Sequence, residues 1–389
     1  MPARRRGPAA ALALALAGLA TAAPARRAEA AVLPSVNSRT AERRLERPPG
    51  VPADAELQNA GARIGRVQIV VRELFDTNRP EEDTSLFRLA NRLHIDTRTS
   101  TVRDQLLFAE GETYSGRLLE ESARLLRTQR YLRDAWVVPV AWHDGVVDIQ
   151  VEVQDVWTFN PGLSFGRKGG ASPSGFELEE LNLLGTGAQL SLGHTSGVDR
   201  DSNLLIYRDR QLGGSWWGVD AQYADNSDGR RTALQLQHPF PALDARWAGG
   251  LALSDDERVD ARYDRGEVTD RYGVREKFAS AWFGVSRGLR GGWPTRYRFG
   301  FTRDEARFSP PPAAQAAALL PADRRLAYPW VSVEWLEDEF QIERNRDQID
   351  RTEDVALGLR ASLQLGFADP AFGADRRATV VNAGVAHGW

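Results

Sequence analysis

Two segments of the sequence match the G-x-S-x-G pattern of a hydrolase nucleophile elbow, and they are centred on Ser164 and Ser286. In an elbow the serine sits on a sharp turn between a strand and a helix, where a histidine and an acid activate its hydroxyl for attack on an ester or amide. Neither segment precedes a helical pattern, and both lie in glycine-rich alternating runs. We therefore expect no catalytic residue and no enzymatic activity.

The acidic and histidine residues do not have the spacing of a metal site. Residues 225–229 (D-N-S-D-G) begin like a calcium loop, but position twelve is Leu236 instead of the bidentate Glu that such a loop needs. The five histidines are scattered and the chain contains no cysteine. Gly185 and Gly187 lack the third glycine and the helix of a dinucleotide site. We expect no metal and no cofactor, although distant ligands could still converge.

Four charged residues occupy the polar positions of alternating segments, where a barrel would turn them toward its lumen. These candidate lumenal residues are Arg296, Arg298, Glu334 and Arg360. Such side chains could form ion pairs across a lumen or tune a pore. Solvation and packing inside the lumen explain any single one of them more simply.

The segments that would position these charges form a long alternating series after Trp157. The clearest is 355–367, in which seven apolar residues alternate with six small or polar ones. Strand side chains alternate between two faces, and about ten residues of a tilted strand cross a bilayer. Aromatic residues stand near the expected strand ends, as in the girdles of membrane barrels: Trp216, Trp217, Trp247, Trp293, Trp330 and Trp335. The pattern favours a mainly β protein with a transmembrane antiparallel β-barrel of about a dozen strands at 157–389 over a soluble sandwich.

The N-terminal residues have the layout of a secretory signal at 1–30. Arginines at positions 4–6 precede an Ala/Leu run that is too short to cross a bilayer, and 28–30 (A-E-A) matches a cleavage site. Residues 31–60 are rich in Pro, Ala, Arg and Glu without periodicity, which indicates a flexible linker. Cleavage after residue 30 would remove five Arg and one Glu, so the formal charge would change from −3 to −7. This acidic balance argues against nucleic acid as a partner.

Between the linker and the alternating segments, the pattern predicts a small α+β domain at 61–156. A polar connection at 74–98 contains a short helical segment at 85–93. An Asp-Gly turn at 144–145 between two apolar runs is typical of a hairpin. The predicted elements, in the order β-α-α-β-β, are a strand at 64–73, a helix at 101–108, a second helix from a Ser115 cap to about Arg130, and strands at 135–142 and 146–153.

Several stretches of this domain resemble a POTRA domain, among them L-F-A-E-G-E at 107–112 and Y-L-R-D-A at 131–135. Residues 180–187 (E-L-N-L-L-G-T-G) resemble the early barrel hairpin of the BamA/TamA-type outer-membrane assembly superfamily. The resemblance covers about residues 61–389. It implies an outer-membrane location with POTRA domains in the periplasm, a barrel of about sixteen strands, and assembly, insertion or translocation of other polypeptides.

The resemblance also implies that client polypeptides add a strand at an exposed edge of the POTRA sheet, where backbone N–H and C=O groups lack partners. The strand at 135–142 is the candidate because it contains Pro139, which an edge strand tolerates. The expected partners are outer-membrane lipid, unfolded or translocating polypeptides and periplasmic accessory proteins. The candidate client-binding residues are Ala135, Trp136, Val137, Val138 and Val140.

The sequence departs from that family in having one clear POTRA domain and fewer strands than the family's barrel. L-R-G-G-W at 289–293 is reminiscent of a late Arg-Gly-aromatic motif of the family, but it lies mid-barrel and has an extra Gly, and we interpret it as coincidence. We expect the chain to be a fragment of a larger barrel, with a complete smaller barrel ending on Trp389 as the alternative. A dedicated secretion transporter and a passive pore remain as functional alternatives.

Overall fold

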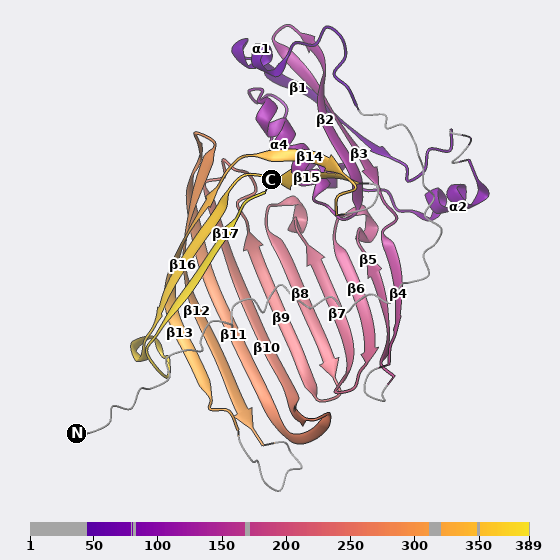
Figure 1. Ribbon diagram of the computed structural model, residues 1–389. Coiled ribbons are helices and arrows are strands. Elements are labelled where there is room, and N and C mark those ends of the chain that lie inside the picture. Colours follow the sequence, from indigo (N-terminus) through magenta and orange to yellow (C-terminus); the bar gives the residue numbers. More distant parts are fainter. Residues whose placement is uncertain are drawn as a thin grey trace.

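The computed structural model describes residues 45–78, 80, 83–167, 172–310, 320–347 and 351–388. They form a small α+β domain that stands at one end of a large antiparallel sheet (Figure 1). We call the end of the sheet beside this domain the proximal end. The predicted signal at 1–30 and Trp389 lie outside the described residues. In the described part of the chain, none of the helices combines the length and the hydropathy that a bilayer crossing requires.

The α+β domain contains a three-stranded sheet in the order β1-β3-β2, in which β3 is parallel to β1 and antiparallel to β2. Four alternating side chains of β3 are fully buried in its core, namely Val147, Ile149, Val151 and Val153. The β2–β3 hairpin turns at Asp144 and Gly145 with φ angles of 50° and 81°, as the Asp-Gly pair predicts. The elements are α1 (Asp54–Asn59), β1 (Arg63–Arg72), α2 (Ser85–Leu93), α3 (Thr99–Arg103), α4 (Gly116–Arg127), β2 (Leu132–His143) and β3 (Val146–Asp155).

The N-terminal boundary of this domain lies earlier than predicted. Residues 54–59, which fall in the predicted 31–60 linker, form α1, and Leu57 of α1 is fully buried in the domain core. The N–H of Gly116, at the start of α4, donates to Oε1 of Gln58 at 3.0 Å. The linker prediction is therefore wrong from residue 54 onward, because a single buried leucine in a short helix leaves no periodic signal.

Two details of the predicted helices are also wrong. The helix expected at 101–108 ends at Arg103, because Leu106 and Phe108 leave the helix and enter the core. Ser115 occupies the N-cap position of α4, but its side chain makes no capping hydrogen bond. The short helix expected at 85–93 is present as α2.

The large sheet has twelve antiparallel strands, which confirms the expected number and the alternating pattern. Sequence neighbours pair throughout, except that β13 pairs with β16. The strands are β4 (Phe159–Phe165), β5 (Ser174–Glu180), β6 (Gln189–Ser196), β7 (Asp201–Asp209), β8 (Gly218–Asn226), β9 (Gly229–His238), β10 (Trp247–Asp264), β11 (Glu267–Arg290), β12 (Trp293–Ser309), β13 (Arg324–Leu336), β16 (Arg360–Ala368) and β17 (Ala378–Ala386).

A separate hairpin, formed by β14 (Phe340–Arg344) and β15 (Thr352–Ala356), interrupts the chain between β13 and β16. The sequence predicted one strand over 355–367, and this is wrong: its first two residues belong to β15, 357–359 connect the two strands, and 360–367 belong to β16. The chain turns a corner at Gly358, where an added Cβ would lie 2.7 Å from Cβ of Glu337. The carboxylate of Glu337 accepts the Leu359 N–H at 2.8 Å. Alternation continues through this corner, so the pattern alone cannot show the break.

The two faces of the large sheet differ in character. One face, the apolar face, exposes large apolar side chains at alternate positions, for example Phe299, Phe301, Val331 and Leu365. On the opposite, inner face, paired residues of five neighbouring strands form a row: Gly250, Trp282, Gly300, Trp330 and Gly366. Trp330, predicted in an interfacial girdle, is instead a buried member of this row.

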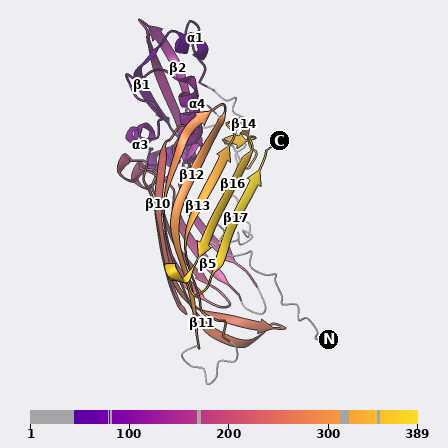
Figure 2. The same ribbon diagram turned by 90° about the vertical axis from the view of Figure 1, so that its left-hand side faces the viewer.

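The sheet curves but has two ends, which are β4 on one side and β17 on the other (Figures 1 and 2). Within the described residues, β4 pairs only with β5 and β17 pairs only with β16. Two strands at the ends of the sheet therefore each have one backbone edge that no described strand covers.

Candidate functional site

The strand predicted to receive clients, β2, is an edge strand of the three-stranded sheet, and β1 is the other edge. The β2–β3 register shifts after Pro139, so Val140 lies at a bulge. Near the start of β2, Nη1 of Arg127 donates to the carbonyl oxygen of Ala135 at 2.9 Å. The other candidates on β2 are half-buried: Trp136, Val137, Val138 and Val140. The five candidates thus share one edge strand, and a side chain of α4 already occupies the carbonyl of the first.

A buried ion pair between Arg127 and Asp354 connects the α+β domain to the β14–β15 hairpin. The Arg127 guanidinium donates from Nε and Nη2 to the two Asp354 oxygens at 2.6 and 2.7 Å. Their side chains are 6% and 7% exposed. A bidentate pair of this kind fixes orientation as well as distance. It therefore holds the hairpin against the end of α4.

A second side chain of α4 reaches the same hairpin. The Arg124 guanidinium lies over the Phe340 ring, 3.5 Å from its centroid, and 3.6 Å from the Asp338 carboxylate. Cation–π contact with a desolvated ring adds to the ion pair. Together with Arg127, Arg124 makes α4 the element that joins the domain to the segment between β13 and β16.

The same helix also contacts the connection between β9 and β10. Glu121 of α4 is buried, and its carboxylate accepts the Leu243 N–H at 2.7 Å and Nη1 of Arg117 at 2.8 Å. Arg117 also pairs with Asp244. This connection in turn packs on the inner face, where Phe240 lies near Gly284. α4 therefore bridges two proximal connections that belong to different parts of the sheet.

Burial raises the pKa of Glu121 above its usual value of 4.5, against the opposing effects of the Leu243 N–H and Arg117. Burial also raises the pKa of Asp134, whose hydrogen bond to Thr352 acts in the opposite direction. In both cases the neutral carboxyl is favoured in the docked structure. Their contribution to stability is therefore complete below the usual pKa and is lost as the pH rises through the raised pKa.

The Glu121→Gln substitution should reduce this pH dependence, because the amide keeps an acceptor for the Leu243 N–H and cannot ionise. The urea midpoint of the α+β domain should fall less steeply between about pH 5 and about pH 8 in the variant than in the wild type. A fluorophore on a single cysteine at exposed Ala55 of α1 can report the transition in the full chain, which has no cysteine of its own. The exposed Glu120→Gln variant is the matched control and should leave the slope unchanged.

The segment that carries the family resemblance, 180–187, forms the β5–β6 turn and docks on the α+β domain. Its Gly185 carbonyl oxygen accepts the Arg98 N–H at 3.0 Å and the Thr101 hydroxyl at 2.9 Å. Gly185 has a φ of 75°, which favours glycine, and an added Cβ there would collide with the Asp96 carbonyl. The buried Asn182 donates to Oγ1 of Thr97 at 2.8 Å. The backbone shape of this turn therefore allows it to hydrogen-bond with the α+β domain, so the motif connects the domain to the large sheet.

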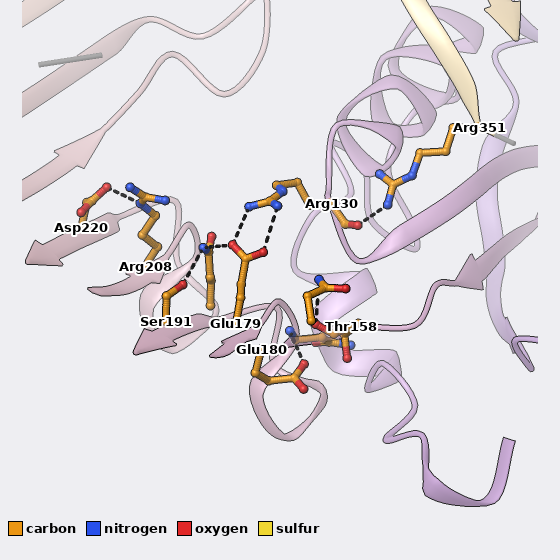
Figure 3. A network of polar contacts seen from close by, with 11 residues as sticks. Arg130, Thr158, Glu179, Glu180, Ser191, Arg208, Asp220 and Arg351 are labelled. Carbon is orange, nitrogen blue, oxygen red and sulfur yellow. Dashed lines mark hydrogen bonds and ion pairs between the residues drawn. The ribbon is translucent and has the colours of Figure 1, made fainter. Parts of the chain in front are cut away.

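A network of polar side chains extends from this β5–β6 turn to the β14–β15 hairpin (Figure 3). Arg130, just after α4, donates to both oxygens of Glu179 on β5 at 3.0 and 3.2 Å. Gln189 on β6 donates to the same carboxylate at 2.7 Å. From the hairpin side, the Arg351 guanidinium donates to the Arg130 carbonyl oxygen. The network therefore links the first strands of the large sheet to the hairpin through the end of α4.

Three of the four candidate lumenal residues meet on the inner face. Glu334 lies 2.9 Å from Nη2 of Arg298 and 3.8 Å from Nη1 of Arg296. The Arg296 guanidinium also lies 4.8 Å from the Phe240 ring centroid. Arg360, at the start of β16 opposite Leu336, lies two residues from Ser362, the pairing partner of Glu334. These charges are therefore paired with one another and with the proximal connection.

Among the described residues, His94, Asp96 and Asp155 come close enough to hold a metal ion. The oxygens of Asp155 already accept from the Thr97 N–H at 2.8 Å and from its hydroxyl at 2.7 Å, and Nε2 of His94 lies 3.0 Å away. A carboxylate with these partners has few lone pairs left for a cation. We interpret the group as the structural joint between α2 and the end of β3.

Sequence reasoning missed the role of α4, which it described only as a second helix of the domain. The available signal was spacing: Arg117, Glu121, Arg124 and Arg127 follow one another at intervals of three and four, which places them along one stripe. That stripe lies away from the leucines that face the core. A helix with a leucine stripe and a separate charged stripe can bury both when it packs between a domain core and a second part of the protein. Nothing in the local sequence at 243–244 or 338–354 indicated that these residues contact α4.

No protein-family model matches the sequence, and no curated protein matches it by sequence. Among solved structures, the chain is similar to CdiB from Acinetobacter baumannii, with 12% identity and a TM-score of 0.43 over 84% of this chain and 48% of that one. It is also similar to BamA from Haemophilus ducreyi lacking POTRA domains 1–3, with 14% identity and a TM-score of 0.33 over 82% of this chain and 77% of that one. The chain thus spans about half the length of the CdiB structure.

Proposed function

We propose that this chain is an outer-membrane β protein that assists the assembly, insertion or translocation of other polypeptides, with its α+β domain in the periplasm and without enzymatic activity. The observation that carries the proposal is a large antiparallel sheet with a lipid-compatible face, next to a small α+β domain whose sheet has β1 and β2 at its edges.

The apolar face supports the membrane location. A lipid-facing strand surface carries apolar side chains between aromatic residues at the interfaces. Large apolar side chains cover this face, and tryptophans stand at the proximal ends of its strands: Trp157, Trp217, Trp247, Trp293 and Trp335. Four of these are among the exposed large apolar residues of the chain. The proximal end with its domain then lies on the periplasmic side.

The edge strands of the α+β domain support the handling of polypeptides. β1 and β2 are the edges of its three-stranded sheet. An extended polypeptide can add a strand at such an edge, because it supplies partners for the backbone N–H and C=O groups there. Hydrocarbon offers no hydrogen-bond partners, so a client strand that enters the bilayer must pair with another strand. We infer that it pairs beside β4 or β17, the two strands that flank the described sheet.

Site-specific crosslinking tests this proposal, because the chain contains no native cysteine. Ser164→Cys places a thiol on β4 and Asn382→Cys places one on β17. Gln222→Cys on β8, which pairs on both sides, is the matched control. The full-length protein in liposomes is mixed with an unfolded outer-membrane barrel polypeptide that carries cysteines along its strands.

We expect disulfide-linked client at one or both edge positions and far less at Gln222→Cys. Equal and low yields at all three positions would remove the role in assembly. If the protein still shows the heat-modifiable migration of a folded membrane sheet, a dedicated transporter would then become the better account.

A further inference from the structure

The helix α2 turns its apolar side away from the protein. Leu86, Leu89 and Leu93 lie at intervals of three and four residues, so they form one stripe along the helix. Their exposed fractions are 67%, 48% and 63%. Ile95, just after the helix, is also exposed. The described residues therefore leave about half or more of each of these three leucine side chains exposed.

The other side of α2 is fixed to the α+β domain by polar and aromatic contacts. The Asn91 amide donates to the Phe75 carbonyl oxygen at 2.9 Å and to Glu73 at 2.8 Å, and its Oδ1 accepts the Phe75 N–H at 3.1 Å. Phe87 stacks on Phe75 with 4.1 Å between ring centroids. A surface helix in water buries its apolar stripe and exposes its polar one. Here the polar amide is anchored and the leucines face outward, which suits an apolar environment outside the chain.

The end of α2 is joined to the proximal end of the sheet near β4. His94 contacts Asp155, two residues before the exposed Trp157. Arg98, a few residues further on, bonds to the β5–β6 turn, whose Leu184 is exposed. Figure 1 places α2 at the proximal end, on the side of β4. The end of α2 is therefore tied to the segment that leads into β4 and to the β5–β6 turn, both at the proximal end of the sheet.

Charge on the flank of α2 agrees with this position. Arg88 and Arg92 are exposed and lie one helical turn apart, beside the leucine stripe. Arg88 pairs with Asp83 at the surface. Helices that lie in a membrane interface combine an apolar stripe with Lys or Arg at its border, where the cations meet lipid phosphates.

We propose that α2 lies in the periplasmic leaflet of the outer membrane, with its leucines among the acyl chains and its arginines at the phosphate headgroups. This inference rests on the proposed function, because it needs the apolar face to be in the bilayer. It identifies α2 as a second membrane contact, which holds the α+β domain at a fixed height beside the edge of β4. The ligand is the lipid surface itself.

Fluorescence quenching in liposomes of phosphatidylethanolamine and phosphatidylglycerol tests the position of α2. An environment-sensitive fluorophore is attached to single cysteines in the full chain. Leu89→Cys and Leu93→Cys probe the stripe, and Ala55→Cys on α1 is the aqueous control. Phe299→Cys and Leu365→Cys report the apolar face independently. Quenchers are a nitroxide on the acyl chain and iodide in the buffer.

We expect blue-shifted emission, strong nitroxide quenching and weak iodide quenching at Leu89→Cys and Leu93→Cys, and the reverse at Ala55→Cys. If the positions on the apolar face are quenched by nitroxide but the α2 positions are quenched only by iodide, the inference is wrong and the proposed function stands. Protection of α2 from both quenchers would show a protein partner there and would also overturn it. If the positions on the apolar face are not quenched by nitroxide, the proposed function itself fails.

The arginines give a separate readout. Arg92→Gln should weaken nitroxide quenching at Leu89→Cys in vesicles that contain phosphatidylglycerol and should have less effect in phosphatidylcholine alone. Arg103→Gln, on α3, is the matched control and should change neither. Equal quenching with and without the Arg92→Gln substitution in both lipids would remove the headgroup contact from the proposal.

Discussion

The Gly300→Val substitution should lower the stability of the large sheet by about 1–3 kcal/mol or more, because it adds side-chain atoms to a filled position. Gly300 lies between Trp282 and Trp330 in the inner-face row, and an added Cβ would overlap the Trp330 ring and lie 2.9 Å from the Ala281 carbonyl oxygen. The Trp330 indole is also held by a 3.0 Å hydrogen bond to Thr302. It cannot move aside without losing that bond.

The measurement is the urea midpoint of the heat-modifiable form in detergent micelles. Gly249→Ala on β10 is the matched control, because an added Cβ there meets its nearest atom at an ordinary 3.5 Å. Glycine within a strand is itself unfavourable, so the control should be neutral or slightly stabilising. Equal midpoints for both variants would show that the indoles do not pack across the glycines as described.

The Arg127→Ala substitution should release the β14–β15 hairpin from the α+β domain, because it leaves the buried Asp354 carboxylate without its partner. Removing one member of a buried ion pair costs about 3–5 kcal/mol. Hydrogen exchange of the hairpin amides in the full chain, followed by mass spectrometry, should therefore accelerate by about a hundredfold or more.

Two further variants separate the ion pair from general damage. Arg88→Ala breaks an exposed pair with Asp83, which should contribute at most about 1 kcal/mol, and it should leave exchange in the hairpin unchanged. Replacing both Arg127 and Asp354 by leucine should restore slow exchange, because two apolar residues need no charge partner. Fast exchange in the double variant and slow exchange in Arg127→Ala would contradict the account of the junction.

Alternation was enough to predict the strands of the large sheet and the composition of their two faces. It works because strand side chains repeat every two residues and each face meets one environment. It could not distinguish an interfacial tryptophan from an inward one: Trp330 and Trp335 both belong to β13, but they differ in parity and so face opposite sides. The strand register would have distinguished them, because Trp330 lies two residues from Ser332, which pairs with the inward-facing Arg298.

The candidate site was predicted only where its parts are local. Neighbouring strands in a hairpin sheet must pair, so Arg296, Arg298 and Glu334 could be brought to one face from sequence order. The contacts of α4 could not be predicted in this way, because Arg127 and Asp354 are 227 residues apart and neither belongs to a repeating pattern. The β14–β15 hairpin was hidden for a related reason, since its alternation continues into β16.

The most direct test of the central claim is the rate at which an unfolded outer-membrane barrel polypeptide becomes protected from protease in liposomes that contain the full-length protein. We expect faster protection than in empty liposomes and in liposomes that hold a passive pore of similar size. We also expect that a client strand peptide crosslinked to Ser164→Cys or Asn382→Cys abolishes this acceleration. Protection at the rate of empty liposomes, from protein shown by its heat-modifiable migration to be folded, would contradict the claim that this chain assembles other polypeptides.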